Sequence, residues 1–272
     1  MELRRLVRGT IPWTELEMVT LEILQRYERE CVRVEFLDAD NWLSTPCVVD
    51  EEWFVKILTP QNALVHAVFT GARNLGAVTT GSEGFFEHFE SPYQMATHEL
   101  EATKRMRRIG LNAPAPIEAF ETGEYAVLVL QFLPAYQTLE ELAAEEVTDW
   151  SPVLFESLRR MHDHQLAHGD VRAENVLVYD DALYFIDATS VDPDGMEGAI
   201  AYDLASALAV LAPAIGVRSA VADAFVYYTT EELLAARDFL DVVRLRPDHE
   251  FDVAAVKGEI EKRASRRPST KG

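Results

Sequence analysis

Three oxygen-bearing side chains, Asp170, Asn175 and Asp187, stand where short local structure can bring them together. Two apolar runs, 176–179 and 183–186, are separated by a pair of aspartates that is typical of a tight turn, so they predict a β-hairpin. Such a hairpin returns Asp187 to the side of Asp170 and Asn175. Carboxylate and amide oxygens are ligands that suit Mg²⁺, so the pattern predicts a magnesium site. The plainer alternative is that these side chains only form turns.

The spacing of these residues resembles the catalytic core of the protein-kinase-like superfamily. There the catalytic loop reads H-x-D-x-x-x-x-N, and a metal-binding aspartate follows a short hairpin. The form HGD at 168–170, in place of HRD, resembles RIO-type and related atypical kinases and small-molecule phosphotransferases. The resemblance implies that Asp170 orients the attacking hydroxyl or accepts its proton. It also implies that Asn175 and Asp187 hold Mg²⁺ and that His168 packs beneath the Asp187 turn.

Two features depart from the family pattern. The turn reads Asp187-Ala188-Thr189 where protein kinases have Asp-Phe-Gly, although the metal-binding aspartate itself is retained. The loop 38–44, which would cover the phosphates of ATP, contains no glycine. Backbone N–H groups approach phosphates most easily where glycine leaves room, so this loop is the weakest point of the resemblance.

Lys56 lies within an apolar strand pattern, 53–58, and resembles the kinase lysine that contacts the α- and β-phosphates of ATP. The ordinary alternative is a lysine on an edge strand. A helix is predicted over 95–109, and Glu99 falls on its apolar face, whereas Glu101 lies off that face and is predicted to be solvated. A buried carboxylate needs a partner, so the sequence predicts an ion pair between Glu99 and Lys56.

The strand pattern at 125–132 leads into a segment that resembles the kinase hinge. The resemblance makes Leu130 the residue behind the adenine pocket and assigns the adenine edge of ATP to the backbones of Gln131 and Leu133. Without the resemblance, this segment is simply a buried strand that enters a loop.

The order of elements predicts an α+β, two-lobed protein-kinase-like fold with a small antiparallel-sheet N-lobe and a mostly helical C-lobe. An N-terminal helical segment, 1–30, carries an amphipathic helix over 13–30. The N-lobe, 31–133, has strands predicted at 32–36, 46–49, 53–58, 119–121 and 125–132, with an insertion at 59–97 that contains a predicted helix at 61–72.

The C-lobe, 134–264, has helices predicted at 138–144, 151–164, 220–228, 230–243 and 251–264. Tyr202 and Asp203 are predicted to open a further, apolar helix. Asp203 is then a candidate N-cap, and the resemblance implies that an Asp at the start of this helix braces the catalytic-loop backbone, so one residue could serve both roles. The basic tail, 265–272, is predicted to be disordered.

The composition limits the classes of function. A formal net charge of −21 argues against direct nucleic-acid binding by the core and against binding to acidic membranes. No secretory signal and no membrane span are evident, and Cys31 and Cys47 are too few for a disulfide framework, so a cytoplasmic protein is expected. The intervals between His162, His164 and His168 do not favour a zinc site.

These inferences together predict an enzyme, an ATP- and Mg²⁺-dependent phosphotransferase that most resembles a RIO-type serine/threonine protein kinase or ATPase. One alternative is a small-molecule phosphotransferase of the aminoglycoside- or choline-kinase type, since there is no long activation segment after Asp187. Another is a nucleotide-binding pseudokinase scaffold, given the altered turn and the loop without glycine. The sequence assigns neither the protein or small-molecule phosphoacceptor nor an oligomeric state.

Overall fold

The computed structural model describes residues 11–37, 44–63, 70, 74, 89–189, 191, 193–244 and 250–266. The predictions for the phosphate-covering loop up to residue 43, for most of the 59–97 insertion and for the tail beyond residue 266 lie outside these residues. The chain divides into two compact units. The N-terminal unit comprises Met1–Gly71, His88–Arg105 and Pro114–Ala135, and the C-terminal unit comprises Ala72–Glu87, Met106–Ala113 and Tyr136–Gly272.

The N-terminal unit is built on a five-stranded antiparallel sheet with strand order β1-β2-β3-β5-β4. Its strands are β1 (Val34–Phe36), β2 (Thr45–Val49), β3 (Trp53–Leu58), β4 (Pro116–Thr122) and β5 (Tyr125–Gln131). The predicted antiparallel sheet is therefore confirmed, with β1 shorter and β4 longer than expected. The two most apolar strands, β3 and β5, pair directly, and Lys56 stands opposite Leu128.

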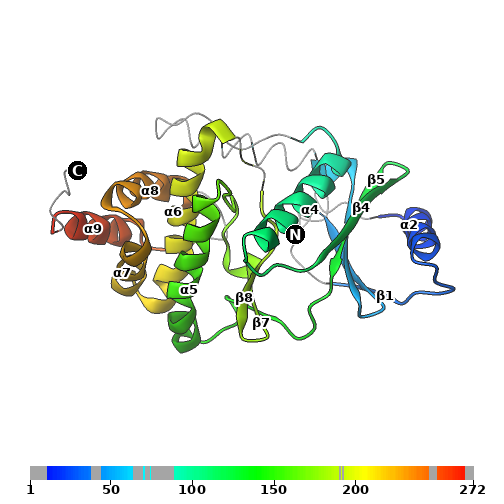
Figure 1. Ribbon diagram of the computed structural model, residues 1–272, viewed down its shortest axis with the longest axis horizontal. Coiled ribbons are helices and arrows are strands. Elements are labelled where there is room, and N and C mark those ends of the chain that lie inside the picture. The colour runs from blue at the N-terminus through cyan, green and yellow to red at the C-terminus, as the bar shows by residue number, and fades with distance from the viewer. Residues whose placement is uncertain are drawn as a thin grey trace. The chain divides into compact units, whose positions relative to one another are not determined.

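Helices cover both faces of this sheet (Figure 1). Because side chains alternate along a strand, Val127 and Val129 of β5 pack with α2 (Trp13–Arg26) on one face. Leu128 and Leu130 face the other way and pack with α4 (Pro92–Arg108). The predicted N-terminal helix is thus present, ends at Arg26 rather than residue 30, and belongs to the core of the unit.

The C-terminal unit is mostly helical, as predicted. Its helices are α5 (Ala144–Asp163), α6 (Met196–Ile215), α7 (Val217–Tyr227), α8 (Thr230–Arg244) and α9 (Val253–Ala264). A small antiparallel sheet joins β6 (Gln137–Thr138), β7 (Val176–Tyr179) and β8 (Ala182–Phe185). Short 3₁₀ turns stand at Ala173–Asn175 and Pro193–Gly195.

The predicted helix at 138–144 is wrong. Thr138 belongs to β6, and the Leu139 N–H donates to the carbonyls of Ala173 and Val176, each at 3.0 Å. The segment then forms a turn, in which the Glu141 N–H donates to the Thr138 carbonyl, and not a helix. Helix α5 then begins at Ala144, well before the expected start at Ser151.

Helix α6 is the buried centre of the C-terminal unit and begins at Met196, earlier than predicted. Within the described part of the chain, it alone is long and apolar enough to cross a membrane, with a mean hydropathy of 1.6 in its best window. Because 67% of that window is buried inside the protein, the same length and hydropathy are also typical of a core helix.

Candidate active site

The catalytic loop begins with a glycine that the backbone requires. Gly169 has φ +73°, a left-handed conformation that most other residues adopt only with strain. This conformation lets two consecutive amides, those of His168 and Gly169, donate to the two carboxylate oxygens of Asp203, each at 2.7 Å. The backbone geometry therefore explains why glycine stands in the middle of the HGD form of the loop.

Asp203 braces this loop and does not cap a helix. It lies inside α6, whose N-cap is Gly195, so the N-cap role is wrong and the brace that the resemblance implied is confirmed. His162 of α5 also contacts Asp203, with 3.1 Å between Nε2 and Oδ2. Sequence analysis assigned His162 no role, because only the tertiary fold brings it to Asp203.

Asn175 orients Asp170. Its Nδ2 donates to the Asp170 carbonyl at 2.9 Å and to the Asp170 carboxylate at 3.1 Å. Both partners are acceptors, so the amide nitrogen must face Asp170, and Oδ1 is the candidate ligating atom of Asn175. Arg172, which sequence analysis did not single out, places its Nε 3.4 Å from the Asp170 carboxylate.

The β7–β8 hairpin returns the chain to the catalytic loop, as predicted. The hairpin pairs Val176 with Phe185, and the next N–H, that of Ile186, donates to the Asn175 carbonyl at 3.1 Å. The Thr189 N–H donates to the His168 carbonyl at 2.8 Å. The residues before and after Asp187 are thus fixed to the loop, and Asp187 itself adopts a left-handed φ of +62°.

His168 is fully buried beneath these groups, which agrees with its predicted packing role. Its Nδ1 accepts the Asp170 N–H at 3.3 Å. Burial lowers the pKa of His168, and the charges of Asp203, Asp170 and Asp187 oppose that shift. The ring is therefore a neutral support surrounded by three carboxylates.

The donor set fits Mg²⁺. Asn175 Oδ1 and the Asp187 carboxylate are hard oxygen donors, and Mg²⁺ commonly takes one or two protein ligands and completes its shell with phosphate oxygens and water. Among the described residues, no group of three or more His, Cys, Asp or Glu side chains could hold a metal ion. When bound, Mg²⁺ would neutralise charge on the transferring phosphate.

Lys56 and Glu99 form the predicted ion pair within the N-terminal unit. Lys56 Nζ lies 2.6 Å from Glu99 Oε1, and the two side chains are only 5% and 15% exposed. Alternation along β3 points Lys56 to the face that α4 covers, and Thr103 Oγ1 donates to the Glu99 carbonyl one turn further along α4. A rigid, paired ammonium is thereby held on the sheet.

The hinge segment has one backbone group of Gln131 already bonded within the N-terminal unit. The Gln131 N–H donates to the Ala115 carbonyl at 2.8 Å, and Gln131 Oε1 accepts the Ala115 N–H at 3.1 Å. The backbone N–H of Gln131 is therefore engaged within the protein. The carbonyl of Gln131 and the backbone of Leu133, just beyond the end of β5, remain the predicted adenine contacts, and Leu130 is buried as expected.

Comparison with known proteins identifies the segment that holds this loop. Residues 88–199 match the family model of the RIO domain. Over these residues, which make up less than half of the chain, the sequence is similar to the RIO domain. The RIO segment contains Glu99, Asp170, Asn175 and Asp187, whereas Lys56 lies before it and is supported by its contact with Glu99.

Solved structures with distant similarity to this chain include kinases and pseudokinases. The Drosophila melanogaster PAN3 pseudokinase is 16% identical with a TM-score of 0.38, and the alignment covers 81% of this chain and 60% of that one. The kinase domain of Mycobacterium tuberculosis PknI is 12% identical with a TM-score of 0.40, covering 86% and 95%. The chain therefore spans about 60% of the length of the Drosophila structure. No curated protein matches it.

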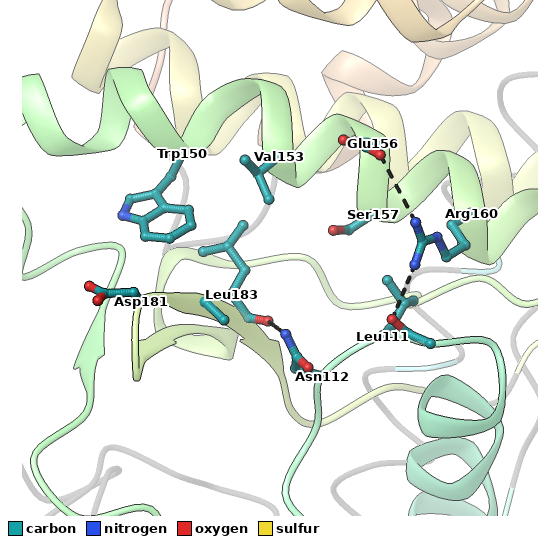
Figure 2. Close-up of a pocket in the computed structure, with 11 residues that line it drawn as sticks. Leu111, Asn112, Trp150, Val153, Glu156, Ser157, Arg160, Asp181 and Leu183 are labelled. Carbon is teal, nitrogen blue, oxygen red and sulfur yellow. Dashed lines mark hydrogen bonds and ion pairs between the residues drawn. The ribbon is translucent and has the colours of Figure 1, made fainter.

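Figure 2 shows a pocket in the C-terminal unit. Its volume is about 240 Å³, and its walls come from α5, from the start of β8 and from the loop 110–112. None of the predicted site residues lines it. The volume is below the roughly 300–1,000 Å³ of typical ligand sites, so the pocket is not assigned a substrate.

Proposed function

We propose that this RIO-type chain catalyses Mg²⁺-dependent transfer of the γ-phosphoryl group of ATP to a serine or threonine hydroxyl of a protein, or to water. The observation that carries the proposal is the catalytic loop itself. Asp203 fixes the loop backbone, Asn175 orients Asp170, and the hairpin fastens Asp187 beside them. Phosphoryl transfer depends chiefly on such positioning and on charge neutralisation.

Each residue then has a distinct task. Asp170 accepts a hydrogen bond, and finally the proton, from the attacking hydroxyl or water. Asn175 and Asp187 hold Mg²⁺ through their oxygens. Lys56, kept in place by Glu99, contacts the α- and β-phosphates, and the Gln131 carbonyl and Leu133 backbone contact adenine.

The charge of the chain also bears on the kind of phosphoacceptor. A formal charge of −21 supports an acceptor that is neither a nucleic acid nor an acidic membrane surface. We further propose a cytoplasmic location. Arg172 pairs with Glu174 at 2.8 Å and lies 3.4 Å from the Asp170 carboxylate, so its charge is offset by two carboxylates beside the proposed catalytic residue.

The deciding experiment is calorimetric titration with ATP, with and without Mg²⁺, followed by measurement of ADP release. Tighter ATP binding with Mg²⁺ together with ADP release is expected. Replacement Asp187→Ala should abolish turnover, and turnover equal to that of the unmodified protein would refute the assignment of Asp187.

A small-molecule phosphotransferase is the second candidate, and one observation favours it. Between Asp187 and the start of α6 at Met196 the chain has only a short connection that ends in the turn Pro193–Gly195. Such a connection is too short for a long peptide-binding activation segment. Labelled ATP offered to both protein and metabolite pools separates the candidates, because a labelled metabolite without labelled protein supports this one.

A pseudokinase scaffold is the third candidate, and the altered turn at Ala188 and Thr189 favours it. The calorimetric experiment tests it directly. Mg²⁺-dependent ATP binding without ADP release under any condition would favour a scaffold over an enzyme.

A further inference from the structure

A buried chain of hydrogen bonds runs from the end of α7 to the catalytic loop. The Tyr228 hydroxyl lies 2.9 Å from His162 Nδ1, and His162 Nε2 lies 3.1 Å from Asp203 Oδ2. Asp203 in turn accepts the backbone N–H groups of His168 and Gly169. Tyr228, His162, Asp203 and His168 are all at most 3% exposed, so water does not compete for these bonds.

The chemistry of the groups limits where the protons lie. A carboxylate only accepts hydrogen bonds, so the proton between His162 and Asp203 must be on His162 Nε2. In the neutral ring, Nδ1 then carries no proton and needs a donor. Burial, reinforced by the charge of Asp203, raises the pKa of Tyr228 far above its ordinary value, so its hydroxyl keeps its proton and can be that donor.

Tyr228 is itself held firmly. It follows the last turn of α7, and its N–H donates to the Ala224 carbonyl. The Arg159 guanidinium lies over the Tyr228 ring, 5.4 Å from its centre, and bonds to Glu232 at 2.7 Å. The hydroxyl therefore has little freedom to leave His162.

We propose that Tyr228 is a positioning residue of the catalytic loop, acting through His162 and Asp203. Its hydroxyl fixes His162 as the tautomer that donates from Nε2, and this donor completes the set of three N–H groups that hold the Asp203 carboxylate. Asp203 then holds the backbone on which Asp170 stands. Only the expected effect on turnover rests on the proposed function, since the hydrogen-bond chain exists with or without catalysis.

The matched variants are Tyr228→Phe and Tyr227→Phe. The first removes only the hydroxyl at Nδ1, and the second removes the hydroxyl of the neighbouring, more exposed tyrosine. The readouts are the nitrogen NMR signals of the His162 ring and amide hydrogen exchange at His168 and Gly169. A buried acceptor that loses its donor destabilises its hydrogen-bond network. The free-energy cost corresponds to roughly a tenfold change in the equilibrium constant for local opening.

Tyr228→Phe should shift the Nδ1 signal of His162 and speed exchange at His168 and Gly169 about tenfold relative to Leu208 in α6. Tyr227→Phe should change neither. Equal acceleration at Leu208 would mean a general loss of stability and would overturn the proposal. So would a wild-type His162 that carries its proton on Nδ1, a measurement that needs no variant to fold.

Turnover provides a separate readout. Tyr228→Phe should lower kcat for ATP turnover several-fold and leave KM for ATP unchanged, because Tyr228 lies behind the loop and not in contact with nucleotide. If the wild-type protein has no turnover, the proposed function fails, while the NMR and exchange results still decide the role of Tyr228. If turnover is normal and exchange at His168 and Gly169 does not respond, only the role of Tyr228 fails.

Discussion

The side-chain amide of Asn175 donates to both the carbonyl and the carboxylate of Asp170, at 2.9 and 3.1 Å. One residue thereby fixes both the backbone and the side chain of the proposed catalytic aspartate. The same two bonds determine that Asn175 Oδ1, not Nδ2, is presented to a cation. The proposed catalytic aspartate and the proposed metal ligand are consequently one coupled unit.

Replacement Asp170→Asn should cut ATP turnover by about 10²- to 10⁴-fold, the usual contribution of a positioned base. The amide oxygen can still accept from Asn175, so ATP affinity should stay near that of the unmodified protein. Single-turnover kinetics and calorimetry measure the two quantities. Unchanged turnover in Asp170→Asn would exclude a catalytic role, and a hydroxylamine-sensitive phosphate on the unmodified protein alone would indicate an aspartyl-phosphate route.

Replacement Asp187→Asn should remove the Mg²⁺ dependence of ATP binding and abolish turnover. Asparagine tolerates the left-handed φ of +62° that Asp187 adopts, so this change removes charge with little backbone strain. Asp181→Asn is the matched control, because Asp181 has φ +55° in the exposed turn of the same hairpin. Calorimetry should show no change for the control, and an equal loss in both variants would contradict the assignment.

The sequence predicts those parts of the site that local patterns encode. The two apolar runs around a turn define the hairpin that carries Asp187. The apolar stripe of α4 identifies Glu99 as a carboxylate in need of a partner, and Lys56 is that partner. Both predictions follow from periodicity and from the cost of burying charge.

The parts that escaped prediction depend on tertiary contacts. The sequence predicted that the helix begins near Asp203. Helix α6 is apolar on all sides, so no amphipathic pattern marks its true start at Met196. His162 has no local pattern that points to Asp203. The 138–144 segment has helical composition, but bonds from Leu139 to the catalytic loop override it.

The Lys56–Glu99 pair should contribute measurably to stability. Glu99→Ala leaves the Lys56 ammonium buried without this partner and should destabilise the protein by roughly 3 kcal/mol in urea unfolding, whereas Lys56→Met with Glu99→Leu should recover most of that loss. Glu101→Ala is the matched control on the same helix. Its pair with Lys104 is exposed, so the cost should stay below about 1 kcal/mol. Equal costs at Glu99 and Glu101 would show that burial of the pair does not matter.

Two glycine-to-alanine replacements should have opposite effects. Gly169→Ala forces alanine into φ +73° and should destabilise the protein by about 1–2 kcal/mol and reduce turnover, because the amides that meet Asp203 must shift. Gly258→Ala, inside α9 with open space around the added methyl, should stabilise the protein by about 0.5–1 kcal/mol. Thermal unfolding measures both, and a neutral Gly169→Ala would rule out a strained backbone as the reason for the HGD loop.

The stability of the protein should fall between about pH 6.5 and pH 5 because of His168. Burial lowers the pKa of His168 in the folded protein, while the unfolded chain has the ordinary value of about 6.5. As the pH falls through that value the unfolded chain binds the proton first, so the free energy of unfolding decreases, by at most about 1.4 kcal/mol per pH unit. His168→Asn keeps an acceptor near the position of Nδ1 for the Asp170 N–H but cannot titrate, so its stability should vary less over the same range. Urea unfolding at pH 7, 6 and 5 measures the difference, and parallel profiles for the two proteins would contradict a buried neutral His168.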